Sequence, residues 1–192
     1  MRRQFIKQMG LSTLGVLLLP KIVFSNDKII KGMRKKAMLA HNVGGFERIT
    51  DEEWSNGLYI QPKLDGVRCL IQYGDGVSPG VIAYSRTGKE WKNIKHILQE
   101  LVPFFQKYPN AILDGELYNH DLKKDFEKII SLVRKTKPTD EDRYEASQKV
   151  QFHCYDTIME HMDFVGRDDF IRRNIGDKFN SVRTVPTVKV YD

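Results

Sequence analysis

The sequence is poor in cysteine and has no biased or repeated segment. Its two cysteines, Cys69 and Cys154, lie in apolar strand-like runs without the spacing of metal ligands, so we expect buried thiols and regard a disulfide as the less favoured alternative. The absence of low-complexity tracts and internal repeats excludes a repeat architecture. What remains is ordinary globular composition, with 41% hydrophobic and 29% charged residues among 192, enough for one domain with a core and at most a small second one.

Acidic residues are absent from the first 26 positions. This start contains four basic residues, Arg2, Arg3, Lys7 and Lys21, so the formal net charge of +6 falls to 27 basic against 25 acidic residues in the rest of the chain. A surplus this small permits a phosphate-rich partner but does not indicate one, because local patches matter more than totals.

A long hydrophobic run is also lacking, although residues 1–25 have the layout of an export signal. The paired arginines within Arg2–Lys7 precede an uncharged stretch, Met9–Pro20, that is too short to span a bilayer. This layout resembles a bacterial twin-arginine signal and predicts a periplasmic protein without a stable membrane anchor. The alternatives are an amphipathic N-terminal helix or a misassigned start codon in a cytoplasmic protein. No Ala-x-Ala site follows, and Val23–Ser25 is a tolerable substitute, so cleavage is left open.

Periodicity predicts a mixed domain after a polar, basic approach segment at residues 26–57. Alternation or short apolar runs predict strands, the first of them buried, over residues 58–60, 67–73, 81–84, 111–118, 150–156 and 185–191. Apolar spacings of three and four predict helices over residues 94–102, 122–133 and 164–175, with Pro103 and Pro109 closing the first segment. A charged loop is expected over 135–148. Strands joined by hairpin-like turns and interrupted by helices indicate an α+β domain built on antiparallel sheet.

Reactive side chains occur at three places on or beside the predicted strands. Lys63–Arg68 combines an amine, a carboxylate and a guanidinium beside an Asp-Gly turn. Asp114 and Glu116 share one face of a strand, and Tyr155 has polar neighbours on another. An amine, carboxylates that can hold a hard cation and a ring that can stack on a base are the parts needed to move a nucleotide. Each group alone also fits a structural role: a hairpin tip with a solvated ion pair, solvent-facing carboxylates, or a tyrosine in the core or on the sheet surface.

Taken together and in order, four motifs resemble the adenylation domain of ATP-dependent DNA ligases, within the covalent nucleotidyltransferase superfamily. Lys63–Arg68 is similar to the Lys-x-Asp-Gly-x-Arg nucleophile motif, and Ser85–Gly88 to the Ser-Arg-x-Gly element. Leu113–Glu116 is similar to the Asp-Gly-Glu strand, and Phe152–Asp156 to the aromatic strand that ends in an aspartate. The resemblance covers roughly residues 37–190 and implies an antiparallel-sheet, ATP-grasp-like nucleotidyltransferase fold, incomplete over residues 58–192 and without an OB domain.

The resemblance implies ATP and Mg²⁺ as cofactors and a lysyl-AMP intermediate. Lys63 would attack the α-phosphate of ATP, expelling pyrophosphate and leaving AMP on its side-chain nitrogen. Because a free lysine has a pKa of about 10.4, burial, cationic neighbours or a bound metal ion would have to lower it. The resemblance further implies contacts to the adenine edge from Gln61, to the ribose from Arg68 and Glu116, to the adenine ring from Tyr155, to a metal ion from Glu116 and to a DNA phosphate from Arg86.

The implied function is the sealing of nicks in duplex DNA during repair, replication or recombination. AMP would pass from Lys63 to the 5′-phosphate at the nick, and the 3′-hydroxyl would displace it. The family continues with a Glu-Gly motif, a Lys-x-Lys motif and an OB domain, which we do not find before Asp192. We therefore expect residues 1–192 alone to seal nicks poorly. The two explanations that stay open are a fragment of a frameshifted or split gene and a chain that needs a second polypeptide to supply the missing motifs.

Other functions share part of this pattern. An RNA ligase or a capping-type guanylyltransferase also contains Lys-x-Asp-Gly, whereas Arg68 and the element Ser85–Gly88 favour the DNA-ligase branch. A non-catalytic remnant that binds nucleotide or nicked DNA is an alternative of a different class. Formation of a lysyl adduct, and the choice between ATP and GTP, would separate these possibilities.

Overall fold

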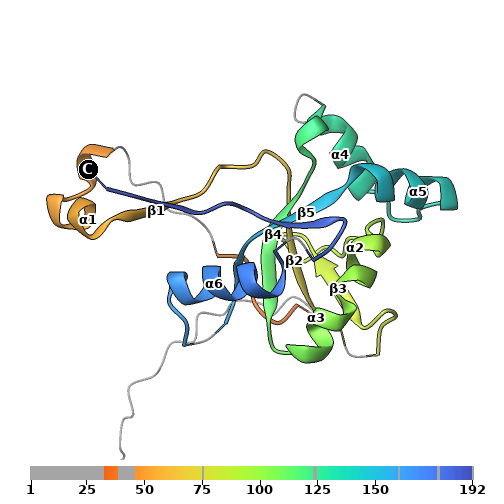
Figure 1. Ribbon diagram of the computed structural model, residues 1–192. Coiled ribbons are helices and arrows are strands. Elements are labelled where there is room, and N and C mark those ends of the chain that lie inside the picture. The colour runs from red at the N-terminus through yellow and green to blue at the C-terminus, as the bar shows by residue number, and fades with distance from the viewer. Residues whose placement is uncertain are drawn as a thin grey trace, which may run out of the picture.

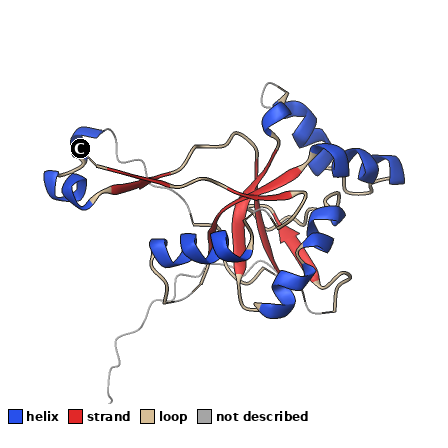
Figure 2. Ribbon diagram, viewed as in Figure 1, coloured by secondary structure: helices blue, strands red, loops and turns tan. Residues whose placement is uncertain are grey.

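The computed structural model describes residues 33–38, 46–74, 76–122, 125–159, 161–176 and 178–191. The predicted export signal at residues 1–25 lies outside these ranges, as does part of the approach segment, so both stay predictions. None of the helices in the described ranges combines the length and apolar character that a bilayer-spanning helix needs. The described chain is a mixed α+β structure with two sheets and several short helices (Figures 1 and 2).

A five-stranded sheet forms the centre of the molecule in the order β3-β2-β4-β5-β6. Its strands are β2 (Val67–Tyr73), β3 (Val81–Tyr84), β4 (Ile112–Tyr118), β5 (Gln151–Thr157) and β6 (Val182–Thr184). The pairs among β2, β3, β4 and β5 are antiparallel, as the sequence predicts, whereas β5 and β6 are parallel. The register between β4 and β5 shifts between Asp114 and Gly115.

Alternation along the central strands sends side chains to two faces of the sheet. On β2, Cys69 and Ile71 enter the large hydrophobic core, to which helices α2 to α6 also contribute. Leu70 belongs to a smaller cluster on the other face, which Arg68 and Gln72 share with it because side chains two apart on a strand point the same way. Both cysteines are fully buried free thiols, which confirms that prediction. The face of the sheet opposite the large core carries the polar side chains of Arg68 and Gln72, so a functional site can form on it.

The helices are short, and three of them, at residues 51–56, 102–107 and 140–149, are not among the predicted ones. The helices are α1 (Asp51–Asn56), α2 (Lys95–Glu100), α3 (Val102–Lys107), α4 (Phe126–Val133), α5 (Asp140–Lys149) and α6 (Phe164–Asn174). Pro103 does not close a helix but lies in the first turn of α3, where its missing N–H needs no partner.

The predicted charged loop at residues 135–148 is wrong, because most of it forms α5. The hydroxyl of Thr139 accepts from the Asp142 N–H at 3.2 Å, and the Asp142 carboxylate accepts from the Thr139 N–H at 3.0 Å. This reciprocal cap starts a helix in which Ala146 is the buried residue. Such a helix has no periodic pattern of apolar residues that would predict it. The capping pair Thr139 and Asp142 is the feature of the sequence that could have predicted its start.

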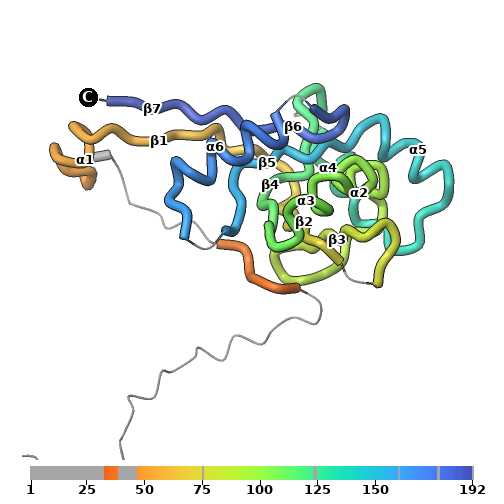
Figure 3. Tube along the Cα trace, turned by 60° about the horizontal axis from the view of Figure 1, so that its bottom comes forward, coloured from red at the N-terminus to blue at the C-terminus, as the bar shows by residue number. Residues whose placement is uncertain are grey.

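A separate ribbon projects from the body of the molecule (Figures 1 and 3). It pairs β1 (Leu58–Ile60) with β7 (Val188–Val190) in antiparallel register and carries α1 at its far end. Residues 58–60 form the predicted strand, but the prediction that it is buried is wrong, since Tyr59 is 42% and Ile60 50% exposed. The strand predicted at 185–191 is shorter, Val188–Val190, and belongs to the ribbon. Strand β6 of the central sheet ends at Thr184, before the predicted range, and Pro186, which has no N–H for a ladder, lies between the two strands.

Candidate functional site

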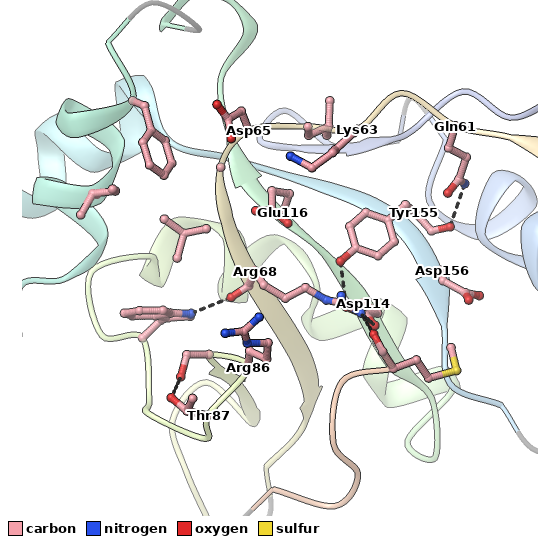
Figure 4. A pocket seen from close by; sticks show the side chains of 18 of the residues that line it. Gln61, Lys63, Asp65, Arg68, Arg86, Thr87, Asp114, Glu116, Tyr155 and Asp156 are labelled. Atoms are coloured by element: carbon pink, nitrogen blue, oxygen red, sulfur yellow. Dashed lines mark hydrogen bonds and ion pairs between the residues drawn. The ribbon is translucent and has the colours of Figure 1, made fainter. Parts of the chain in front are cut away.

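A cleft of about 1080 Å³ opens beside the polar face of the central strands. Its lining includes every residue that the sequence predicts for the site, namely Gln61, Lys63, Arg68, Arg86, Glu116 and Tyr155. These residues come from five separate segments: the loop after β1, strand β2, the turn after β3, strand β4 and strand β5. Figure 4 shows them around one space. Their convergence is a property of the fold, and their chemical roles stay predictions.

Lys63 lies in the loop between β1 and β2. The hairpin-tip alternative is wrong, because β1 pairs with β7 while β2 pairs with β3 and β4. Gly66 brings this loop against β4: a Cβ at Gly66 would lie 2.4 Å from the Leu117 carbonyl oxygen and 2.7 Å from Cγ of Glu116. Only glycine fits so close an approach. The exposed amine of Lys63 is thereby held on the side of Glu116 (Figure 4).

Asp114 ties together two of the predicted nucleotide contacts. Its fully buried carboxylate accepts from Arg68 Nε at 2.8 Å and Arg68 Nη2 at 2.6 Å, and from the Tyr155 hydroxyl at 3.3 Å. The guanidinium carbon of Arg68 also lies 5.2 Å from the centre of the Tyr155 ring. A buried carboxylate is tolerated when it is paired and hydrogen-bonded in this way. Asp114 is therefore committed to Arg68, and it does not form a free cation-binding pair with Glu116.

Burial dominates the ionisation of this cluster. It raises the pKa of the Asp114 carboxyl, against the opposing effect of the Arg68 guanidinium, and it raises the pKa of the Tyr155 phenol, so that Tyr155 stays a hydrogen-bond donor. Burial, with a smaller contribution from Asp114, also raises the pKa of Glu116 to about 7, while Arg68 and Lys63 act to lower it. Glu116 is the carboxylate of this set that changes charge near neutral pH.

The described residues of the cleft do not form a metal site made wholly of protein ligands. The described residues contain no group of three or more His, Cys, Asp or Glu side chains that could hold one. Mg²⁺ usually takes one or two carboxylates and completes its shell with water and substrate phosphates. Glu116, half-buried on the cleft floor, fits as such a single carboxylate ligand.

Gln61 lies at the end of the cleft where the ribbon meets the body. Its amide nitrogen donates to the backbone carbonyl of Tyr155 at 2.9 Å and to the hydroxyl of Thr187 at 2.9 Å. The side chain is therefore anchored to β5 on one side and to the segment before β7 on the other. Figure 4 shows it beside the Tyr155 residue whose ring is the predicted stacking surface.

Two cationic residues of the cleft escaped the sequence analysis. Lys89 follows the turn that carries Arg86, and Arg134 follows α4, whose Phe126 and Ile130 also line the cleft. Among the described residues, none pairs with the charged side-chain ends of Lys63, Arg86, Lys89 or Arg134. The spacing of four between Phe126, Ile130 and Arg134 could have revealed the last of these, because it places them on one helix face.

Asp156 has a structural partner. Arg167 on α6 donates to its two oxygens at 2.7 and 3.1 Å, a bidentate pair that fixes α6 beside β5. The aspartate at the end of the aromatic strand is thus engaged away from the nucleotide contacts, although it still borders the cleft.

Comparisons with solved structures agree with this fold. Pmar-Lig_Pre and Pmar-Lig_PreS3 each align with a TM-score of 0.56 and 20% identity over 80% of this chain and 35% of theirs. A Lig E DNA ligase, described as binding DNA with a minimal scaffold, aligns with a TM-score of 0.50 and 18% identity over 72% of this chain and 47% of its own. The chain thus spans less than half the length of the structures it matches. A comparison with curated proteins finds no match.

Sequence comparison carries the assignment further than these structural likenesses do. The family described as ATP dependent DNA ligase domain matches residues 37–185, a range that contains all four motifs and every predicted site residue. The motifs lie on one cleft in a fold shared with DNA ligases. The chain therefore belongs to the ATP-dependent DNA ligase domain family and contains its nucleotidyltransferase adenylation domain.

Proposed function

We propose that this chain transfers AMP from ATP to Lys63 and that the adenylated lysine serves the sealing of nicked duplex DNA. The observation that carries this proposal is the position of the Lys63 amine in the same cleft as Gln61, Glu116 and Tyr155. An amine nucleophile next to an aromatic ring and a carboxylate suits attack on a bound nucleotide.

In the transfer of AMP to Lys63, different residues of the cleft bind different parts of ATP. Tyr155 offers its ring to adenine, Gln61 its amide to the base edge, and Arg68 with Glu116 their polar ends to the ribose. Arg86, Lys89 and Arg134 attract the phosphates of ATP. These three cations can do so because no described carboxylate neutralises their charge. Glu116 is also the residue that would hold Mg²⁺ beside the phosphates, and a bound ion there neutralises charge as pyrophosphate leaves.

The covalent step exchanges one bond to phosphorus for another. The deprotonated Lys63 nitrogen forms a P–N bond to the α-phosphorus while the P–O bond to pyrophosphate breaks. The Lys63 ammonium group loses one proton to become the nucleophile and a second as the P–N bond forms, and both pass to solvent, to which Lys63 is exposed.

AMP then passes to the 5′-phosphate of a nick, with Arg86 on a DNA phosphate. The exposed Arg86 is carried by a turn in which Ser85 Oγ accepts from the Lys89 N–H at 2.9 Å and the Ser85 carbonyl accepts from the Gly88 N–H. Such a turn presents a guanidinium outward, where its planar fork suits phosphate oxygens. The likeness to a DNA-binding ligase supports nicked DNA as the partner.

The test is covalent labelling with ATP that is radioactive at the α-phosphate, in the presence of Mg²⁺. We expect a labelled protein whose bond is acid-labile, as phosphoramidates are, and which is lost in Lys63→Ala. Lys92→Ala removes an exposed lysine outside the cleft and should keep the label. A label that survives Lys63→Ala would overturn the nucleophile assignment, and labelling by GTP in place of ATP would favour a capping-type enzyme. Chase with nicked DNA tests the transfer of AMP.

We also propose that the twin-arginine-like residues 1–25 direct export to the periplasm. The support is the sequence alone, because this segment lies outside the described residues. A reporter fused to residues 1–30 should be exported, and changing Arg2 and Arg3 to Lys should retain it in the cytoplasm. Unchanged export in that variant would contradict the twin-arginine route.

A further inference from the structure

A chain of hydrogen bonds runs from α6 to the edge of the cleft. Gln61 Nε2 donates to Thr187 Oγ1 at 2.9 Å, and Thr187 Oγ1 donates to Asp168 Oδ1 at 2.6 Å. Arg172 holds the far end, because its Nε donates to Asp168 Oδ2 at 2.7 Å and its Nη2 to the Thr187 carbonyl at 2.9 Å. Four residues on three segments, the Lys63 loop, α6 and the approach to β7, are thus joined in series.

The direction of each bond follows from what the end groups can do. The Asp168 carboxylate, paired with Arg172, only accepts, so the single hydroxyl proton of Thr187 goes to it. Thr187 Oγ1 can then only accept from Gln61. The other neighbour of the Gln61 amide is the Tyr155 carbonyl, which also only accepts. Both neighbours require the NH₂ group, so the amide has one favourable orientation instead of the two that look alike by shape.

This orientation leaves the amide oxygen as the group that Gln61 offers to a ligand. The two amide hydrogens are used by Tyr155 O and Thr187 Oγ1, and within the described ranges no residue donates to Gln61 Oε1. The side chain borders the cleft next to the Tyr155 ring. A flat base on that ring would therefore meet a hydrogen-bond acceptor at this edge.

We propose that Asp168, acting through Thr187, is a positioning residue that makes the cleft select a base bearing an amino donor over one bearing a carbonyl acceptor. Adenine presents an amino group at the position where guanine presents a carbonyl oxygen. The oriented Gln61 oxygen accepts a hydrogen bond from the amino group of adenine. Against the carbonyl oxygen of guanine it places two hydrogen-bond acceptors in contact, which is unfavourable. The inference rests on the proposed use of this cleft for nucleotides and names the device that would set ATP over GTP.

Three variants and a matched control test the relay. Thr187→Val keeps the shape of the side chain and removes the hydroxyl. Asp168→Asn lets the new amide donate to Thr187, which frees the hydroxyl to donate to Gln61 and so opposes the native orientation. Thr187→Ser retains the hydroxyl. Asp169→Asn is the control, since Asp169 is an exposed neighbour that pairs with Arg173 at 2.7 Å and is not part of the relay.

The measurements are the equilibrium dissociation constants of ATP and GTP and the KM and kcat for lysyl-adduct formation with each. We expect the ATP-over-GTP preference to fall about tenfold in Thr187→Val and Asp168→Asn, through KM and the dissociation constant of ATP, with kcat nearly unchanged. Thr187→Ser and Asp169→Asn should keep the wild-type preference. A merely structural role would lower the affinity for both nucleotides together and leave their ratio unchanged.

The outcomes separate this inference from the proposed function. Absence of a Lys63 adduct with either nucleotide would reject the proposed chemistry, while the ratio of dissociation constants would still decide the relay. An unchanged ratio in both relay variants, an equal fall in Asp169→Asn, or a wild-type chain that binds neither nucleotide or both equally would overturn the relay. If Thr187→Val is unfolded by circular dichroism, the ratio in Asp168→Asn decides.

Discussion

The central sheet and the β1–β7 ribbon hold their parts of the cleft by different means. Arg68, Glu116 and Tyr155 stand on three hydrogen-bonded strands above a buried core. Gln61 and Lys63 lie instead in the loop that leaves the ribbon, where Tyr59 and Val188 are 42% and 54% exposed. Three of the groups predicted to bind the nucleoside thus stand on the platform of the sheet, whereas Gln61, predicted to contact the adenine edge, and the predicted nucleophile Lys63 lie on a weakly buried arm, formed by the ribbon and the loop after β1.

The exposed contacts of the ribbon are aromatic and cationic. Towards the body, the ring of Tyr59 on β1 lies 5.6 Å from that of Phe164 on α6, and within the ribbon Lys189 Nζ on β7 lies 5.4 Å from the Tyr59 ring centre. Exposed contacts of this kind contribute about 0.5–1 kcal/mol each, less than one well-buried apolar side chain. Because the ribbon is held by weaker contacts than the sheet, we expect substitutions in the sheet to lower the free energy of unfolding and substitutions in the arm to change the geometry of the reaction.

The largest expected effect breaks the platform itself. Phe152→Ala on β5 removes a fully buried ring and should lower the free energy of unfolding by about 3–5 kcal/mol. Val188→Ala on the ribbon, at 54% exposure, should change it by less than about 0.5 kcal/mol. Urea unfolding followed by circular dichroism measures both. Equal losses would contradict the distinction between platform and arm.

The buried ion pair is the next test of the platform. Asp114→Asn keeps the size of the side chain but removes the charge that Arg68 faces, so we expect a loss of about 2–3 kcal/mol in unfolding free energy and weaker ATP binding. Asp140→Asn is the control, because Asp140 is fully exposed and its ion pair with Arg143 is long, at 3.8 Å, and therefore weak. Calorimetric titration with ATP and thermal unfolding report the two effects. A stable Asp114→Asn variant with full ATP affinity would show that the pair does not organise the cleft.

The arm should be more sensitive in rate than in stability. Gly66→Ala forces the loop away from the Leu117 carbonyl and Glu116, which displaces Lys63. We expect lysyl-adduct formation to fall by about 100-fold, since misplacement by about an ångström has effects of this size, with a stability loss of only about 1 kcal/mol. Gly76→Ala has open space around the new Cβ but a φ of +71°, so it controls for the strain of an added side chain without moving Lys63. A rate that survives Gly66→Ala would imply a mobile loop.

The smallest expected effect is the pH dependence contributed by His153 on β5. Burial, helped by Arg183 and His120, lowers its pKa from 6.5 to about 4, so the ring is neutral in the folded chain. Below pH 6.5 the unfolded chain binds a proton that the folded chain does not, and stability therefore falls as the pH drops from 6.5 towards 4. His153→Gln should remove about 1–2 kcal/mol of this loss, allowing for solvent screening at a half-buried ring.

His161→Asn is the control for this pH test. His161 is exposed and has a φ of 72°, a conformation that asparagine tolerates. Denaturant midpoints measured at intervals across this pH range compare the two variants. An unchanged slope in His153→Gln would show that other groups produce the acid sensitivity.

Local patterns were sufficient for the strands that carry the motifs. The alternation around Arg68 predicted β2, and the spacing of Asp114 and Glu116 predicted that both side chains share a face of β4; both line the cleft. The same reasoning missed α5, because a helix whose buried residue is Ala146 carries no apolar stripe. It also took Leu58–Ile60 for a buried strand, since an apolar run does not reveal whether anything covers it.

By itself the sequence determined the order of the motifs, the strands that carry them and the residue types offered for chemistry, because alternation and turn preferences depend on neighbours in the chain. Tertiary structure alone decided that Asp114 pairs with Arg68, that Thr187 and Asp168 reach Gln61, and that Arg134 faces the same cleft. The physical reason is distance along the chain. Contacts between residues 46 or 126 positions apart form only when strand partners and helix packing have been chosen, and many weak interactions make that choice jointly.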